Sequence, residues 1–300
     1  MTLPVFLELV EFKAKTASVL PFLIGVCYSW YHYQSLHLGY VVIYFIAMLI
    51  FNMAVDILDN YNDYHHATQV HDYKEKTNII GREHLNIKQV FWLMISMIVI
   101  SATMGIILSF YVGWPFLVMG IYCYLVGIFY SSGPRPLSSL PLGELFSGLT
   151  MGFMISMICV YLNAYQVFTW DLSTVAAIFL IALPNTLWIA NLMLANNICD
   201  LEEDENNNRY TLVHYLGKKR SLHLFMGLNI LAFVAILAMA ILRLAPWSVL
   251  GTFLIAPFVF KQTRLFLAKQ VKRETFICAV RILAVGATTL VFFFAIGLLF

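Results

Sequence analysis

Apolar stretches long enough to cross a lipid bilayer recur along almost the whole chain. A helix needs about 17–25 predominantly apolar residues to span roughly 30 Å of hydrocarbon. Long polar connections alternate with short ones, so the long ones all fall on one side of the membrane. The pattern predicts about nine transmembrane helices, at 17–36, 40–58, 88–110, 114–130, 143–163, 174–197, 221–243, 246–262 and 276–300.

The composition is typical of an all-α, polytopic membrane helix bundle. Hydrophobic residues make up 61% of the chain and charged residues only 11%, whereas roughly a quarter of the residues in a soluble domain are charged. We expect a single membrane-embedded domain over residues 1–300 that binds no nucleic acid. The second and sixth predicted helices both end in a segment rich in Asn and Asp, which suggests an internal duplication around them.

Lysine and arginine predict the orientation, because positive charge is retained on the cytoplasmic side of short loops. With a cytoplasmic N-terminus, all 18 Lys and Arg residues except Arg243 and Arg281 lie in segments on that side, Lys74 and Lys76 among them. We therefore expect a multi-pass protein of the cell membrane with an external C-terminus. The long polar connections, and any site that they carry, would face the cytoplasm.

The inner end of the second predicted helix carries a stripe of oxygen-bearing side chains. Asn52, Asp56, Asp59 or Asn60, and Asp63 are spaced by three and four residues, so on a helix they stack along one face. Neighbouring carboxylates raise one another's pKa unless a cation neutralises them. Mg²⁺ prefers oxygen ligands and commonly binds together with substrate phosphates. The stripe therefore predicts a magnesium site, with a solvated, capped helix end as the alternative.

A second cluster repeats this chemistry at the inner end of the sixth predicted helix. Asp200 and Asp204 are four residues apart, and Asn196 precedes them by one turn. Polar groups close to hydrocarbon are expensive and usually functional. Two such stripes on equivalent helices favour a metal site over two unrelated helix ends.

Basic residues follow these clusters along the chain. Arg82, Arg135 and Arg209 lie in the long polar connections, where fixed cations beside Mg²⁺ would neutralise a diphosphate as it binds and leaves. Tyr130 precedes the Ser131–Pro136 segment, whose Gly and Pro residues predict a tight turn. We expect Tyr130 at the rim of the cavity that holds the site.

Several stretches resemble one known family. The sequence resembles the UbiA superfamily of intramembrane prenyltransferases, and most of all its 1,4-dihydroxy-2-naphthoate polyprenyltransferase branch. The first motif of the superfamily falls on Asn52, Asp56 and position 60, and the second on Asp200 and Asp204. Asn60 differs from the superfamily motif, so Asp59, Asn60 or Asp63 supplies the third ligand. The branch-specific matches are Lys15-Thr16 with Pro21 and Gly25, Asn60–Tyr64, Tyr130–Leu137, Leu142–Glu144, Asn196–Asp200, Arg209–Leu212 and Leu216-Gly217.

The resemblance implies a nine-helix enzyme that uses Mg²⁺ to transfer a polyprenyl group from its diphosphate to a small aromatic acceptor. The acceptor it implies is 1,4-dihydroxy-2-naphthoate, which would lose CO₂ to give demethylmenaquinone; 4-hydroxybenzoate, homogentisate and haem are the alternatives. Asp56, Asp200, Asp204 and Tyr130 would be the catalytic residues. Lys15 would bind the diphosphate together with the three arginines.

A cation-coupled membrane transporter is the competing class of protein, because paired intramembrane aspartates also bind permeating ions. Both clusters, however, lie at inner helix ends rather than at mid-membrane. We also expect no Gly or Pro break at mid-depth in the helices at 40–58 and 174–197. These two features favour the enzyme.

Overall fold

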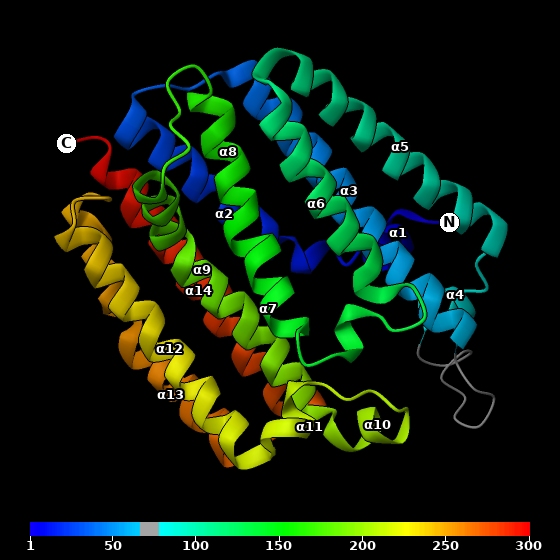
Figure 1. The fold of residues 1–300 in the computed structure, drawn as a ribbon. Helices are drawn as coiled ribbons and strands as arrows, with labels where there is room; N and C mark the ends of the chain where they lie inside the picture. The colour runs from blue at the N-terminus through cyan, green and yellow to red at the C-terminus, as the bar shows by residue number, and fades with distance from the viewer. Residues whose placement is uncertain (67–77) are drawn as a thin grey trace. The chain divides into compact units, whose positions relative to one another are not determined.

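The computed structural model describes residues 1–66 and 78–300, so Lys74 and Lys76 lie outside the described residues. The described residues form helices and no strands (Figure 1). They divide into two compact units, which are described separately below. Unit 1 comprises Met1–Thr16 and Leu38–Pro136, and unit 2 comprises Ala17–His37 and Leu137–Phe300.

Unit 1 is built around α3, the helix that carries the first polar stripe. Both α5 and α6 pack on α3, and the short α1 and α4 contact each other (Figure 1). Buried apolar residues of α3 and α5, among them Ala54, Ile57 and Met94, form its core with Leu9 and Ile80. The elements of unit 1 are α1 (Leu3–Leu9), η1 (Phe12–Lys15), α3 (Leu38–His66), α4 (Ile79–Arg82), α5 (Ile87–Val112) and α6 (Trp114–Ser131).

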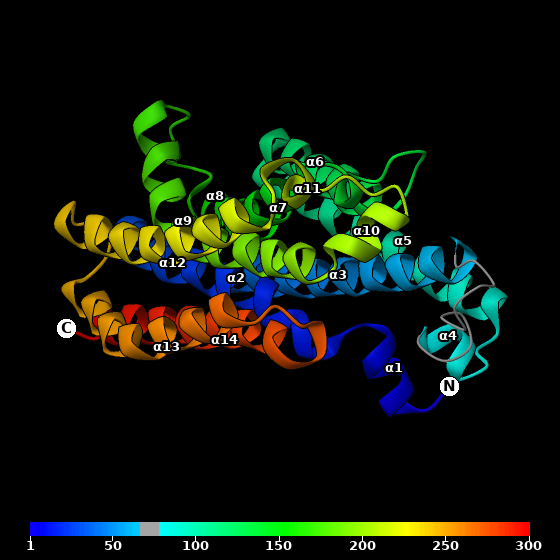
Figure 2. The ribbon, with the colours of Figure 1, turned by 90° about the horizontal axis from the view of Figure 1, so that it is seen from below.

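Unit 2 is built around α9, which packs on α12, α14 and η6, and Figure 2 shows α12 running alongside it. Large aromatic residues such as Trp188 and Phe225 are fully buried there. Its elements are α2 (Thr16–Tyr28), η2 (Ser29–Tyr33), η5 (Leu137–Ser139), α7 (Gly143–Ser147), η6 (Gly148–Met154), α8 (Ile155–Ala164), α9 (Leu172–Cys199), α10 (Leu201–Asn206), α11 (Leu212–Leu216), α12 (Lys218–Ile241), η7 (Trp247–Ile255), α13 (Ala256–Ala268) and α14 (Lys272–Gly297).

The predicted all-α class is confirmed, and eight helices within the described residues are long and apolar enough to cross a membrane. The first predicted span, 17–36, is the exception. Its α-helical part has 13 residues, which cover about 20 Å at 1.5 Å per residue. The polar and aromatic residues of η2 (Ser29–Tyr33) continue it as a π-helix, and their low hydropathy separates this segment from the other eight.

Two further differences concern the helices that carry the stripes. The α3 helix continues to His66, so Asp59 and Asp63 lie on the helix and not in the polar connection predicted from residue 59. The α9 helix contains Pro184, so the expectation that no proline lies at mid-depth is wrong. The helix is nevertheless continuous from Leu172 to Cys199, because neighbouring groups can satisfy the carbonyl that proline leaves free.

A glycine allows the η6 and α9 helices of unit 2 to approach closely. A Cβ atom at Gly152 would lie 2.4 Å from the Thr186 Cα atom of α9, and small residues commonly allow such close approach between membrane helices. Gly152→Ala should therefore destabilise the fold by about 1–3 kcal/mol and lower the thermal midpoint in detergent. Gly227→Ala in α12 is the matched control, because its Cβ atom would meet nothing within 4 Å. Equal melting of the two variants would contradict the prediction.

Candidate active site

The α3 helix separates a polar stripe from an apolar face. Asp59 and Asp63 are exposed, whereas Ala54 and Ile57 are fully buried in the unit 1 core. At 100° per residue, Asp56, Asp59 and Asp63 fall on one side of the helix with Asn52, as the spacing predicts. The spacing therefore predicts correctly that these three aspartates of α3 share one face.

Lys15 neutralises the central aspartate of this stripe. The η1 helix places its side chain so that Nζ donates a hydrogen bond to Asp56 Oδ2. Lys15 is only 5% exposed, and burial lowers its pKa to about 8, against the opposing effect of the Glu11 carboxylate. The structure therefore puts Lys15 on the aspartate stripe, where its positive charge could also meet a diphosphate.

The Asn60 side chain bonds to the backbone of two segments of unit 1. Its side-chain amide donates to the carbonyl oxygens of Asp56, at 3.0 Å, and of Leu9, at 3.4 Å. These bonds turn the amide nitrogen toward the backbone of α3 and of the residues at the end of α1. The amide nitrogen is thus held by backbone carbonyl groups, and the choice among Asp59, Asn60 and Asp63 as the third ligand stays a prediction.

Asn62 ties the end of α3 to the end of α6. Its amide donates to the Ser131 carbonyl oxygen at 2.8 Å and to Ser132 Oγ at 2.9 Å. The chain turns just after this point, with Gly133 at φ 97°, as the Gly and Pro residues predict. Half-buried Tyr130 precedes the turn and exposed Arg135 lies within it. The sequence gives no sign of the role of Asn62, because its partners are about 70 residues away.

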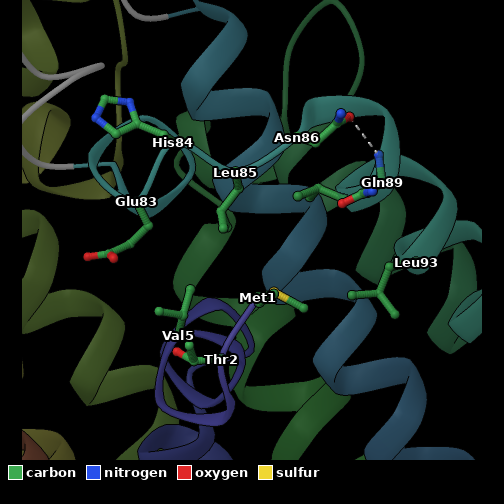
Figure 3. A pocket seen from close by; sticks show the side chains of 10 residues that line it. Met1, Thr2, Val5, Glu83, His84, Leu85, Asn86, Gln89 and Leu93 are labelled. Atoms are coloured by element: carbon green, nitrogen blue, oxygen red, sulfur yellow. Dashed lines mark hydrogen bonds between the residues drawn. The ribbon is translucent and has the colours of Figure 1, made fainter.

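Arg82 is paired with glutamates and not with the aspartate stripe. Its guanidinium donates to Glu8 Oε1 at 2.7 Å and to Glu83 Oε1 at 3.1 Å, and these bonds raise its pKa above the usual value. A cavity of about 420 Å³ lies nearby, between α1, the turn after α4 and the start of α5 (Figure 3). None of the predicted site residues lines that cavity.

Unit 2 holds the second cluster where α9 ends, close to α10 and α11 (Figure 1). Asp200 is the residue between α9 and α10, so the stripe is not on one continuous helix as predicted. The turn-to-turn hydrogen bonds persist across it, from Asp200 N to Asn196 O at 3.0 Å and from Asp204 N to Asp200 O at 2.8 Å. Asn196, Asp200 and Asp204 therefore remain in successive turns despite the change of helix.

Lys272, at the start of α14, is a site residue that the sequence analysis missed. Its ammonium donates to both Asn196 Oδ1 and Asp200 Oδ2, and it lies 5.3 Å from the centroid of the Phe276 ring. Lys272 thus does for Asp200 what Lys15 does for Asp56. Each of the two units pairs the first aspartate of its cluster with a lysine.

Asp204 is the most buried carboxylate of the second cluster, with 6% exposure. Its Oδ1 lies 3.3 Å from Arg209 Nε, so Arg209 is at the predicted cluster. Its Oδ2 is buried without a hydrogen-bond partner. Burial raises the pKa of Asp204 to about 6, although the Arg209 guanidinium opposes this shift. A buried carboxylate oxygen without a partner fits a site that receives a cation.

The donor set of both clusters suits Mg²⁺, which prefers carboxylate and amide oxygens and usually keeps several waters. Within residues 1–66 and 78–300, however, no three His, Cys, Asp or Glu side chains come together as a ready metal site. The oxygen chemistry and the unpartnered Asp204 Oδ2 therefore fit the ion, and the individual ligands stay predictions.

These features define a class: a multi-pass membrane protein whose paired Asn/Asp clusters are each neutralised by lysine. Residues 18–283 match the UbiA prenyltransferase family, and the chain belongs to that family of prenyl-transferring enzymes. It is 26% identical over 237 residues to the 1,4-dihydroxy-2-naphthoate octaprenyltransferase of Bacillus subtilis (strain 168), covering 77% of this chain and 72% of the relative. The family predicted from the motifs is thus confirmed.

Solved structures support the same fold. A UbiA homologue from Aeropyrum pernix K1 superposes with a TM-score of 0.72 at 16% identity, covering 92% of this chain and 97% of that one. A UbiA homologue from Archaeoglobus fulgidus, bound to GPP and Mg²⁺, superposes with a TM-score of 0.65 at 11% identity, covering 97% of this chain and 99% of the homologue. The sequences are distant, so this likeness concerns the fold.

Proposed function

We propose that the protein transfers a polyprenyl group from its diphosphate to 1,4-dihydroxy-2-naphthoate, with loss of CO₂, to give demethylmenaquinol, the hydroquinone form of demethylmenaquinone. The observation that carries the proposal is the pair of Asn/Asp clusters, on α3 and at the end of α9, each held by a lysine. Likeness to the B. subtilis naphthoate octaprenyltransferase supports this acceptor. A homologue with GPP and Mg²⁺ bound supports the donor and the metal.

The predicted ligands divide between the two units. Mg²⁺, when bound, supplies the positive charge that stabilises the leaving diphosphate. On α3, Asn52, Asp56 and Asp63 would hold one Mg²⁺ ion, with Asp59 as the alternative to Asp63. In unit 2, Asn196, Asp200 and Asp204 would hold another.

The cationic residues would bind the diphosphate oxygens, because preorganised positive groups stabilise charge that develops as a bond breaks. Lys15 and Arg209 lie on the aspartates and are the leading candidates. Arg135 remains a candidate from its exposed turn, and Arg82 would first have to leave Glu8. Tyr130, just before the same turn, would face the allylic cation with its electron-rich ring.

The chemistry fits a membrane-embedded helical protein. Cleavage of the C–O bond would leave an allylic cation and a diphosphate, and the electron-rich acceptor ring would attack the cation. The ring would then lose its carboxylate as CO₂ and its hydroxyl groups would be retained. A lipid-buried helix bundle keeps water from the cation. The distribution of Lys and Arg supports a site on the cytoplasmic side.

A product-mass experiment tests the proposal. Purified protein is incubated with Mg²⁺, one polyprenyl diphosphate and each candidate acceptor in turn. We expect a product only with the naphthoate, at the mass of the prenylated acceptor less CO₂. A product with 4-hydroxybenzoate, homogentisate or haem instead would identify that compound as the acceptor. Cation flux in liposomes without any prenyl transfer would favour the transporter.

Lys272 provides a separate test of the second cluster. Lys272→Met removes a charged hydrogen-bond donor from Asn196 and Asp200, an interaction typically worth about 1.5–3 kcal/mol, so kcat/KM should fall roughly 10–100-fold. Lys269→Met is the matched control, because Lys269 pairs with Glu274 at 2.5 Å on the exposed surface nearby. Initial rates of prenyl transfer measure both. A Lys272→Met enzyme as active as the control would show that Lys272 does not contribute to the site.

A further inference from the structure

Glu144 is a buried carboxylate inside a membrane span, and the proposed chemistry does not use it. It lies in the first turn of the Gly143–Ala164 span and is 5% exposed. Its Oε1 accepts a hydrogen bond from Asn197 Nδ2 at 2.8 Å, whereas its Oε2 is buried without a partner. Intramembrane carboxylates are rare because hydrocarbon disfavours them, and those that occur usually mark function.

The partner of Glu144, Asn197, lies in the last turn of α9. Asn197 is 4% exposed and adjoins Asn196, whose side chain meets Lys272. The helix ends two residues later, at Cys199, and the next residue, Asp200, donates a backbone hydrogen bond to Asn196 O at 3.0 Å. A hydrogen bond to a buried carboxylate on another helix would fix the rotation of this last turn, and with it the direction of Asn196 and Asp200.

The segment that carries Glu144, Leu137–Ser147, also contacts the chain that follows the second cluster. Tyr210 N donates to the Ser139 carbonyl oxygen at 3.1 Å, and Tyr210 directly follows Arg209, the partner of Asp204. The segment Leu137–Ser147 therefore contacts the chain both before Asp200 and after Asp204. One of its two hydrogen bonds reaches Asn197, before the cluster's aspartates, and the other reaches Tyr210, after them.

We propose that Glu144 is a positioning residue for the second cluster. Through Asn197 it fixes the end of α9, so that Asn196 and Asp200 are set to receive Mg²⁺ and a diphosphate. This role rests on the proposed function of the cluster. Groups that orient metal ligands commonly change metal affinity by about 10–100-fold when they are removed, so the effect should be measurable without turnover.

The test measures thermal stabilisation by Mg²⁺ together with inorganic diphosphate as the probe. Wild-type protein should melt at a higher temperature as Mg²⁺ is added at fixed diphosphate. Glu144→Ala should need roughly tenfold more Mg²⁺ for half of the maximal shift. Glu144→Gln should need no more than about threefold, because its amide oxygen can still accept from Asn197.

Two further variants make the comparison specific. Asn197→Ala removes the same hydrogen bond from the other helix and should reproduce the effect of Glu144→Ala; it also serves if Glu144→Ala does not fold. Asn229→Ala is the matched control, because the Asn229 amide donates to Thr263 Oγ1 at 3.1 Å between two other helices of unit 2. It should leave the Mg²⁺ requirement at the wild-type value.

The outcomes separate this inference from the proposed function. An unchanged Mg²⁺ requirement in Asn197→Ala, or an equal shift in Asn229→Ala, would reduce Glu144 to a packing role. A Glu144→Gln protein as impaired as Glu144→Ala would show that the charge itself acts, which overturns positioning through the hydrogen bond. If wild-type protein shows neither stabilisation nor prenyl transfer, the proposed function falls and this inference falls with it.

Discussion

Asp56→Ala and Asp200→Ala are each expected to lower the rate of prenyl transfer by at least about 10³-fold, because each removes the central carboxylate of a cluster whose charge the leaving diphosphate requires. Since this charge acts as the diphosphate leaves, the loss should appear in kcat. Initial rates at saturating polyprenyl diphosphate measure it. Activity near the wild-type value in both variants at low Mg²⁺ would contradict the assignment.

In Asp56→Ala, the Lys15 ammonium loses its partner. Lys15 is buried against Asp56, and removal of one partner of a buried ion pair typically destabilises a protein by about 3–5 kcal/mol. Asp56→Ala could therefore lose activity by unfolding. The double variant Lys15→Met/Asp56→Ala removes the unpaired charge and should melt closer to wild type while remaining inactive. Recovery of activity in that double variant would show that Asp56 serves only to neutralise Lys15.

A nearby acidic residue gives the control for the second variant. Glu203 is exposed on α10, next to Asp204 but with its side chain on a solvated face. Glu203→Gln removes the same charge as a substitution of Asp200 does, at nearly the same place in the chain. It should keep wild-type rates. An equal loss of activity would mean that the net acidity of the segment matters, and not the ligands at 196, 200 and 204.

The sequence allowed the helices and one stripe to be predicted because both depend on local rules. Bilayer thickness sets the length of an apolar run, and the helical repeat places Asp56, Asp59 and Asp63 on one face. Eight of the predicted spans correspond to helices that can cross a membrane. The segment at 17–36 was harder, because its last residues are aromatic and polar and its α-helix ends at Tyr28.

The partners of the acidic residues could not be predicted, because they depend on contacts between distant segments. Lys15 lies 41 residues from Asp56, and Lys272 lies 72 residues from Asp200. One signal was available for Lys272. It is the first residue of α14, and a cation is unfavourable at a helix N-terminus, so an acidic partner from another segment was to be expected. No comparable signal pointed to the bond between Glu144 and Asn197.

Chelation of divalent cations is expected to abolish prenyl transfer, with a loss of at least about 10³-fold. Lys15 and Lys272 each bring one positive charge to their cluster, which offsets one aspartate, so most of the charge that a leaving diphosphate needs has to come from the metal. Added Mg²⁺ should restore the rate. Ca²⁺ should restore little, because it takes more ligands at longer distances and does not hold the octahedral geometry of Mg²⁺.

The same lysines explain why the chelated protein should stay folded. With Asp56 and Asp200 neutralised by Lys15 and Lys272, the carboxylates do not depend on the metal for their stability. Circular dichroism and gel filtration in detergent should therefore be unchanged by chelation while activity is lost. Unfolding on chelation would assign the metal a structural role. Full activity after chelation would exclude Mg²⁺ from the reaction, since the lysines would then have to supply all of the positive charge that the leaving diphosphate needs.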